Sequence, residues 1–234
     1  MQLFYNPTIA KHDQDFYFNK NESRHIVKVL RKKSGDKILI TNGLGYIFES
    51  KILLSDPNKC QVKILKVTKQ SRQKHNIHLA VAPTKLNDRF EWFLEKATEI
   101  GVDEITPIFC TNSERKVIKP NRYNKIIHAA AKQSLRAYFP ILRPAVKFKD
   151  FVHNFKSENH FIAHCMDAPK PHLKSELKLN QDVLILIGPE GDFTTTEIEL
   201  AEQNGFKAIS LGNSRMRTET AAIMACHTVQ LCHV

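Results

Sequence analysis

The sequence predicts an α/β fold of two domains: a small β-barrel in residues 1–70, then a larger domain of parallel strands and helices in residues 71–234. Two observations predict this fold. Short strands joined by tight turns fill the first 70 residues, and strands alternate with helices after residue 75. The length of 234 residues allows two domains to bury their own cores.

In the first domain, short apolar runs are separated by turn residues. A short helix is predicted at 25–30, and strands at 37–41, 46–54 and 61–68. The turn at 42–45 contains Asn42, Gly43 and Gly45, residue types that accept positive φ angles. The polar run 69–74 is the predicted linker to the second domain.

In the second domain, strands are predicted at 77–81, 104–109, 161–165, 183–187 and 208–211. Helices are predicted at 88–100, 120–136, 194–205 and 217–230. Gly101, Pro120, Gly205 and the capping box of Thr194 with Glu197 favour helix ends at these positions. Such alternation is typical of a mostly parallel sheet with helices on both faces.

The net charge of +11 is unevenly distributed along the chain. Residues 1–70 and residues 71–150 each carry a net +7, whereas residues 151–234 carry a net −3. A polyanion such as nucleic acid is the natural partner of the basic first two thirds. The acidic last third is expected to have a different role.

Two glycine loops in the acidic third form the candidate site. The segment 188–191 follows the apolar strand 183–187, and the segment 212–214 follows the strand 208–211. Ligands of open parallel sheets bind beyond the carboxyl ends of the strands, so both loops are expected to line one pocket. The negative charge suits a cationic sulfonium cofactor better than a phosphate-rich one. Two ordinary strand-to-helix turns would give the same spacing, and this alternative stays open.

Three segments resemble the signature of the bacterial 16S ribosomal RNA uracil-N3 methyltransferases, the RsmE family in the SPOUT class of knotted methyltransferases. They are residues 187–193, 210–212 and 217–221. Upstream matches around His25, Trp92 and Arg115 extend the resemblance over nearly the whole chain. The chain departs from the family pattern at Asp192, Lys132 and Leu135.

The resemblance implies a PUA-like β-barrel followed by a SPOUT domain with a trefoil knot, assembled as a homodimer. It implies methylation of N3 of a specific uridine in 16S ribosomal RNA of the small subunit, with S-adenosylmethionine (SAM) as cofactor. The expected cofactor-binding residues are Ala163, His164, Cys165, Leu186, Ile187, Gly188, Pro189, Glu190, Gly191, Ser210, Leu211, Gly212, Asn213, Met216, Arg217, Thr218 and Ala221.

Methyl transfer to uracil N3 requires the loss of the N3 proton and stabilisation of the resulting negative charge. Arg217 is expected to stabilise that charge or to clamp a phosphate. Glu219 is expected to accept the proton or to hold Arg217 in place. A salt bridge of the two residues at the start of the last helix is the structural alternative.

Basic side chains of the first 150 residues are the expected contacts to RNA phosphates. They are Arg24, Lys28, Arg31, Lys32, Lys33, Lys85, Arg89, Arg115, Lys116 and Arg136.

The five cysteines include no C-x-x-C pair, which is typical of reduced thiols in a cytoplasmic protein. Neither a metal site nor a membrane span is expected. Two other functions stay open: ribose 2′-O methylation by another SPOUT enzyme, and a non-catalytic RNA-binding factor of ribosome assembly.

Overall fold

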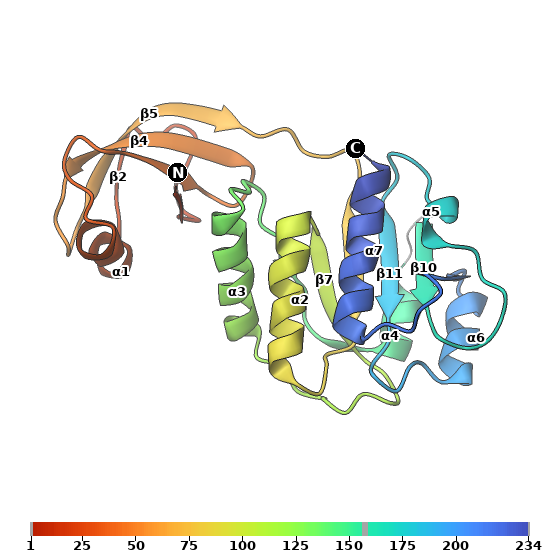
Figure 1. Ribbon diagram of the computed structural model, residues 1–234. Coiled ribbons are helices and arrows are strands. Elements are labelled where there is room, and N and C mark those ends of the chain that lie inside the picture. The colour runs from red at the N-terminus through yellow and green to blue at the C-terminus, as the bar shows by residue number, and fades with distance from the viewer. Residues whose placement is uncertain (1, 156–158, 234) are drawn as a thin grey trace. The chain divides into compact units, whose positions relative to one another are not determined.

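The computed structural model describes residues 2–155 and 159–233 (Figure 1). The chain divides into two compact units: residues 1–72 with 131–139, and residues 73–130 with 140–234. The first division point lies close to the predicted boundary at residue 70. Residues 131–139, which the prediction places in the second domain, group with the first unit instead.

The described part of the first unit contains a five-stranded sheet in the order β1-β3-β4-β5-β2. The strands are β1 (Leu3–Tyr5), β2 (Asp15–Tyr17), β3 (Lys37–Thr41), β4 (Tyr46–Leu54) and β5 (Gln61–Lys69). β1 runs parallel to β3, and the other neighbours are antiparallel. Alternate apolar side chains point to one face and form a core around Phe4, Ile40 and Phe48.

A helix crosses that core before β3. It consists of α1 (Lys20–Arg24) and a wider π turn, His25–Val29, so it begins earlier than predicted from the sequence. Asn19 fixes its start because the Asn19 side chain accepts a hydrogen bond from Glu22 N at 3.0 Å.

The segment 131–139 packs against the turn between β3 and β4 within the same unit. Ala137 O accepts hydrogen bonds from Gly45 N at 2.9 Å and from Thr41 Oγ1 at 3.2 Å. The rings of Phe139 and Tyr5 stack with centroids 4.6 Å apart. This segment therefore satisfies polar groups of the β-sheet that are distant in sequence.

The second unit is built on a parallel sheet in the order β12-β10-β11-β6-β7-β8, with β9 also paired to β7. All its strand pairs in the described residues are parallel. The strands are β6 (Ile77–Val81), β7 (Glu104–Phe109), β8 (Ile141–Leu142), β9 (Val146–Lys147), β10 (Asn159–Ala163), β11 (Val183–Ile187) and β12 (Lys207–Ile209).

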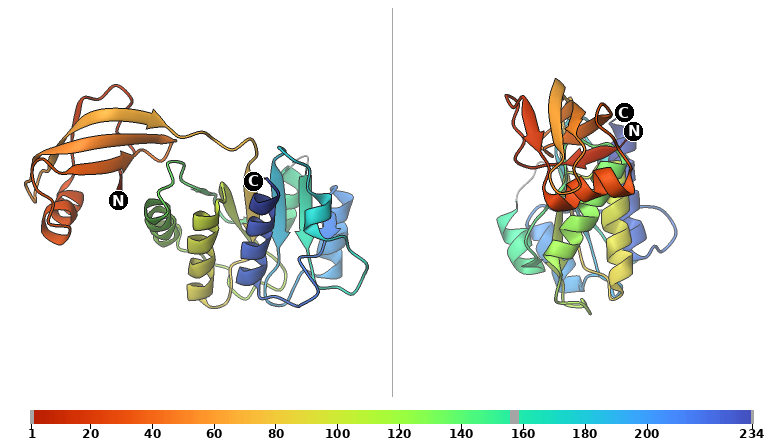
Figure 2. Two further views of the ribbon diagram at one scale, coloured as in Figure 1. Left: turned by 45° about the horizontal axis from the view of Figure 1, so that its top comes forward. Right: turned by 90° about the vertical axis from the view of Figure 1, so that its left-hand side faces the viewer.

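Helices cover both faces of this sheet (Figures 1 and 2). One face packs α2 (Asn87–Ile100), α3 (Pro120–Gln133), α5 (Leu173–Glu176) and α7 (Thr218–Cys232), and the other packs α4 (Phe148–Asn154) and α6 (Thr195–Gln203). β11 is apolar throughout because Val183 and Ile185 face the first layer, whereas Leu184 and Leu186 face the second.

Several element ends differ from the sequence prediction. β10 ends at Ala163 instead of residue 165, and β12 ends at Ile209 instead of 211, because the following residues turn away to line a cavity. α3 ends at Gln133 instead of 136, since Leu135 adopts a positive φ of 57°. The short elements β2, β8, β9, α4 and α5 carry too little periodicity to be predicted.

None of the helices in the described part of the chain combines the length and apolarity required to cross a bilayer.

Candidate functional site

A cavity of about 570 Å³ lies beyond the carboxyl ends of β10 and β12. Its walls come from residues 163–168 with Lys170, from residues 209–216, and from Ala221 of α7. The predicted cofactor residues that line it are Ala163, His164, Cys165, Ser210, Leu211, Gly212, Asn213, Met216 and Ala221. The structure therefore brings together two segments that are almost fifty residues apart in the sequence.

The loop after β12 presents its backbone to this cavity. Ser210 Oγ donates a hydrogen bond to Gly212 O at 3.0 Å and accepts one from Gly212 N at 3.1 Å. Gly212 has a φ of 143°, which a residue with a side chain rarely adopts. The amide and the carbonyl of Gly212 are thus both bonded to Ser210 Oγ, and Gly212 lines the cavity.

The other predicted glycine loop, residues 188–191, is attached to the start of α7. Thr218 Oγ1 donates a 3.0 Å hydrogen bond to Gly188 O, and Thr218 is buried. Glu190 of the same loop contacts Lys85 instead of α7, because Glu190 Oε1 accepts a hydrogen bond from Lys85 N at 2.9 Å. Leu186 and Ile187 are buried in β11, and the predicted cofactor residues 186–191, Arg217 and Thr218 are not among the residues that line the cavity.

Asp192, which the sequence marks only as a departure from the family pattern, contacts the cavity wall. Its Oδ2 accepts a hydrogen bond from Cys165 N at 2.7 Å, which joins the loop after β11 to the cavity wall. Asn112 Nδ2 donates to both Gly191 O and Asp192 O at 3.0 Å. The sequence feature that could have indicated this contact is the position of Asp192 directly after the glycine loop, where a carboxylate can reach a neighbouring loop.

The charged groups on the cavity wall are Asp167, Lys170 and Arg215. Burial lowers the pKa of His164, and the nearby Lys170 lowers it further, against weaker opposing effects of Asp192 and Glu202. Lys170 Nζ lies 3.4 Å from His164 Nδ1. His164 is therefore mainly uncharged at neutral pH.

The two predicted catalytic residues lie at the start of α7 in different environments. Arg217 is exposed and forms the N-cap position. The Glu219 side chain is only 7% exposed, and its Oε1 lies 3.8 Å from Arg89 Nε of α2. Glu219 Oε2 has no hydrogen-bond partner in the described part of the chain. The ion pair thus joins Glu219 to Arg89, which the sequence analysis assigns to RNA.

The other predicted RNA contacts fall into two groups. In the first unit Arg24, Lys28, Arg31 and Lys33 are exposed and Lys32 is half-buried, and Arg136 belongs to this unit as well. In the second unit Lys85 pairs with Glu114 at 2.7 Å, and Lys116 is exposed. Arg115 donates to Thr84 O at 3.0 Å and to Lys85 O at 2.8 Å, which fixes the loop in place.

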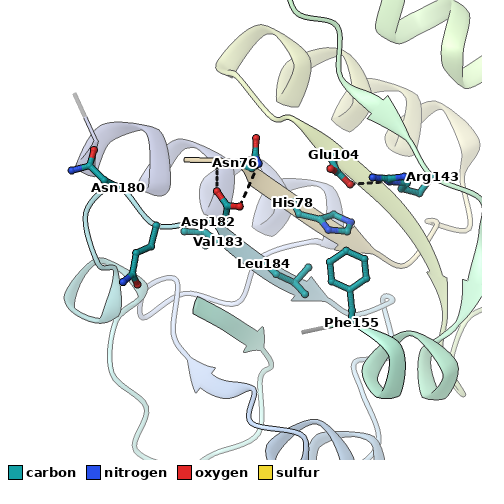
Figure 3. A pocket seen from close by; sticks show the side chains of 10 residues that line it. Asn76, His78, Glu104, Arg143, Phe155, Asn180, Asp182, Val183 and Leu184 are labelled. Atoms are coloured by element: carbon teal, nitrogen blue, oxygen red, sulfur yellow. Dashed lines mark hydrogen bonds and ion pairs between the residues drawn. The ribbon is translucent and has the colours of Figure 1, made fainter. Parts of the chain in front are cut away.

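A second cavity, of about 520 Å³, lies at the opposite ends of the strands, near the amino ends of β6, β7 and β11 (Figure 3). Several of its polar groups are paired within the protein. Arg143 Nε donates to Glu104 Oε2 at 2.8 Å, and Asp182 Oδ1 accepts from Asn76 N at 2.7 Å. His78 is buried beside Phe155, and burial lowers the pKa of His78 to about 4. These contacts link the amino ends of neighbouring strands to each other.

The first cavity fits the predicted cofactor. Its volume falls within the ~300–1,000 Å³ typical of small-molecule sites. Leu211, Met216 and Ala221 give the cavity an apolar surface that suits an aromatic ring, and the carbonyl oxygens of Ser210 and Gly212 each keep a second lone pair for a further hydrogen bond.

Two family models match the chain. Residues 71–230 match an RNA methyltransferase domain, and residues 18–65 match an RNA methyltransferase PUA domain. Ribosomal RNA small subunit methyltransferase E of Buchnera aphidicola subsp. Acyrthosiphon pisum is 34% identical over 92% of this chain and 87% of its own length.

Solved structures agree over the full length. A probable rRNA-methyltransferase from Porphyromonas gingivalis is 39% identical, with a TM-score of 0.91 and 99% coverage of both chains. A ribosomal RNA small subunit methyltransferase E from Neisseria gonorrhoeae bound to SAM is 26% identical, with a TM-score of 0.87, covering 100% of this chain and 98% of its own. The chain therefore belongs to the RNA methyltransferase family, together with the ribosomal RNA small subunit methyltransferases E.

Proposed function

We propose that the protein transfers a methyl group from SAM to N3 of a specific uridine in 16S ribosomal RNA. The observation that carries this proposal is the cavity beyond β10 and β12, because residues 210–212 and Ala221, which belong to the segments that resemble the uracil-N3 methyltransferase signature, line it. The full-length similarity to small subunit methyltransferases E supports it, as does the SAM bound to the relative from Neisseria gonorrhoeae.

When bound, SAM supplies an electrophilic methyl group. The turn at Ser210–Gly212 and the apolar side chains of Leu211 and Met216 would hold its adenosyl part. Arg217 is exposed at the start of α7, where it can stabilise negative charge on the uracil ring. Glu219 Oε2 has no hydrogen-bond partner among the described residues and is assigned as the acceptor of the N3 proton.

The RNA is proposed to bind through the first unit. Arg24, Lys28, Arg31 and Lys33 are exposed there and free to contact phosphates. The match of residues 18–65 to an RNA methyltransferase PUA domain supports this role.

A second copy of the chain is the proposed partner of α7. Met224, His227 and Leu231 form one exposed stripe on this helix, and Leu231 is 60% exposed. Exposed apolar side chains in a stripe are typical of a subunit interface. Sedimentation is expected to give the mass of a dimer for the native chain and of a monomer for Met224→Glu with Leu231→Glu. A native monomer at micromolar concentration would contradict the assignment.

The trefoil knot is inferred from the connection between β10 and β11. This connection contacts the segment that leads into α7, because Leu173 N donates to Ser210 O and Ser210 N donates to Pro171 O, both at 2.9 Å. A tracing of this region in an experimental electron-density map tests the threading.

The cytoplasm is the proposed compartment. All five cysteines are free thiols in the structure, which suits a reducing environment and access to ribosomes. Cell fractionation with an antibody to the chain tests this assignment.

The test of the reaction is incubation of the protein with isotopically labelled SAM and either 16S ribosomal RNA or small ribosomal subunits. The RNA is then digested to nucleosides. Labelled 3-methyluridine is expected, and a labelled 2′-O-methyl nucleoside would assign the other SPOUT reaction. Absence of both labelling and SAM binding would favour a non-catalytic assembly factor.

A further inference from the structure

Asp192 joins the loop after β11 to the loop after β10, and the loop after β10 forms one wall of the cavity. Its Oδ2 accepts from Cys165 N at 2.7 Å, and its Oδ1 accepts from Phe193 N at 2.8 Å. Asp192 adopts a positive φ of 62°, a conformation that Asp and Asn tolerate better than most residues. The carboxylate is thereby held directly behind Cys165, which is part of the cavity wall.

The charges of the wall explain why a carboxylate at this place matters. Lys170 and Arg215 are cationic, and only Asp167 opposes them on the wall itself. The imidazole of His164 adds no charge at neutral pH, because burial and the nearby Lys170 lower its pKa. The wall alone would therefore repel a sulfonium ion, and the charge of Asp192 behind Cys165 offsets this excess.

We propose that Asp192 is a specificity-determining residue, whose charge makes the cavity prefer the cationic cofactor over its uncharged thioether product, S-adenosylhomocysteine. This inference rests on the proposed function, because it takes SAM as the cofactor. The two molecules differ by the methyl group and by the positive charge on sulfur. A fixed carboxylate beside the wall favours only the charged one, so it also promotes product release after transfer.

The experiment uses the full chain and the substitution Asp192→Asn. Asparagine suits the positive φ and keeps one oxygen that can accept from Cys165 N, so the variant removes the charge and the local hydrogen bond from Phe193 N. The affinity for S-adenosylhomocysteine reports any effect of the lost hydrogen bond, because this ligand carries no charge on sulfur. Calorimetry measures the dissociation constants of SAM, S-adenosylhomocysteine and sinefungin, in which a protonated amine replaces the sulfonium. Asp150→Asn is the matched control, because Asp150 is an exposed carboxylate on α4 without a role in the cavity.

The affinities for SAM and sinefungin are expected to fall about 3- to 10-fold in Asp192→Asn, the effect of one charge across a partly solvated site, whereas that for S-adenosylhomocysteine stays unchanged. The control is expected to match the native chain. An equal loss for all three ligands would reduce Asp192 to a structural link and overturn the proposal, as would unchanged affinities. If the native chain binds none of the three, the proposed function itself fails.

Discussion

At the residue scale, the site depends on side chains that bond to the backbone of a different loop. Thr218 reaches Gly188 O, Asp192 reaches Cys165 N, and Asn112 reaches Gly191 O. Each bond gives a buried or constrained backbone group its partner. The geometry of the cavity is therefore sensitive to single substitutions outside its wall.

The substitution Thr218→Val tests this dependence. It leaves the carbonyl of Gly188 without its donor in a buried position, so the free energy of unfolding is expected to fall by about 1–3 kcal/mol. The affinity for SAM is expected to fall as well, because the loop loses its anchor. Ser175→Ala is the control, since Ser175 Oγ also bonds a backbone carbonyl, His172 O at 2.7 Å, but at the surface. Equal effects of the two substitutions in urea titration and calorimetry would contradict this account.

Arg217 offers a second prediction at this scale. Arg217→Ala is expected to abolish methylation while SAM binding and thermal stability stay close to native. The reason is that the exposed guanidinium makes no capping hydrogen bond to α7, so its removal leaves the fold intact. Turnover of labelled SAM on ribosomal RNA and calorimetry measure the two properties. Near-native turnover would remove Arg217 from the reaction.

At the scale of elements, β6 carries a buried histidine whose charging opposes folding. The pKa of His78 is about 4 in the fold, mainly because of burial, against 6.5 in an exposed histidine. As the pH falls, the unfolded chain binds a proton at His78 before the folded chain does. The free energy of unfolding is therefore expected to fall by about 2 kcal/mol between pH 7 and pH 5 from this residue.

Urea titration followed by the fluorescence of Trp92, the single tryptophan, reports on this unit because Trp92 lies in α2. The substitution His78→Gln is expected to reduce the pH dependence of the free energy of unfolding by the amount that His78 contributes. Some slope is expected to remain, since burial also lowers the pKa values of His75 and His164. A variant with the same slope as the native chain would show that His78 titrates normally in the fold.

The helices and strands show which features of the fold follow from local sequence and which do not. The uniformly apolar β11 and the capping box of α6 were predicted at or near their positions, because each depends on local side-chain chemistry. β10 and β12 were predicted too far toward their carboxyl ends, since the turn into the cavity is set by tertiary contacts such as Asp192 with Cys165. The partner of Glu219 was missed for the same reason, because Arg89 is far from it in sequence.

At the scale of the whole molecule, the uneven charge predicts a salt-dependent RNA interaction. Replacing Arg31, Lys32 and Lys33 with Gln is expected to weaken RNA binding and to reduce the slope of log affinity against log salt by about 2–3, the effect of up to three lost phosphate contacts.

The control variant replaces Lys174, Lys178 and Lys207, which lie in the acidic last third, with Gln. It changes the net charge equally and is expected to leave the salt slope unchanged. Filter binding at several salt concentrations measures both variants. If both variants change the salt slope equally, RNA binding depends on the total charge of the protein. If neither variant changes it, the first unit is not the RNA-binding surface.

The segment 131–139 has a consequence for how this protein can be dissected. Since the first unit takes its last nine residues from the middle of the chain, the polypeptide crosses between the units after residues 72, 130 and 139. A fragment cut at residue 72 would lose Ala137, the acceptor for Gly45 N and Thr41 Oγ1. The first unit is therefore not a detachable module at the amino-terminal end of the second. Recombining it with another enzyme requires transplanting two separate pieces of sequence, which constrains both protein engineers and evolution.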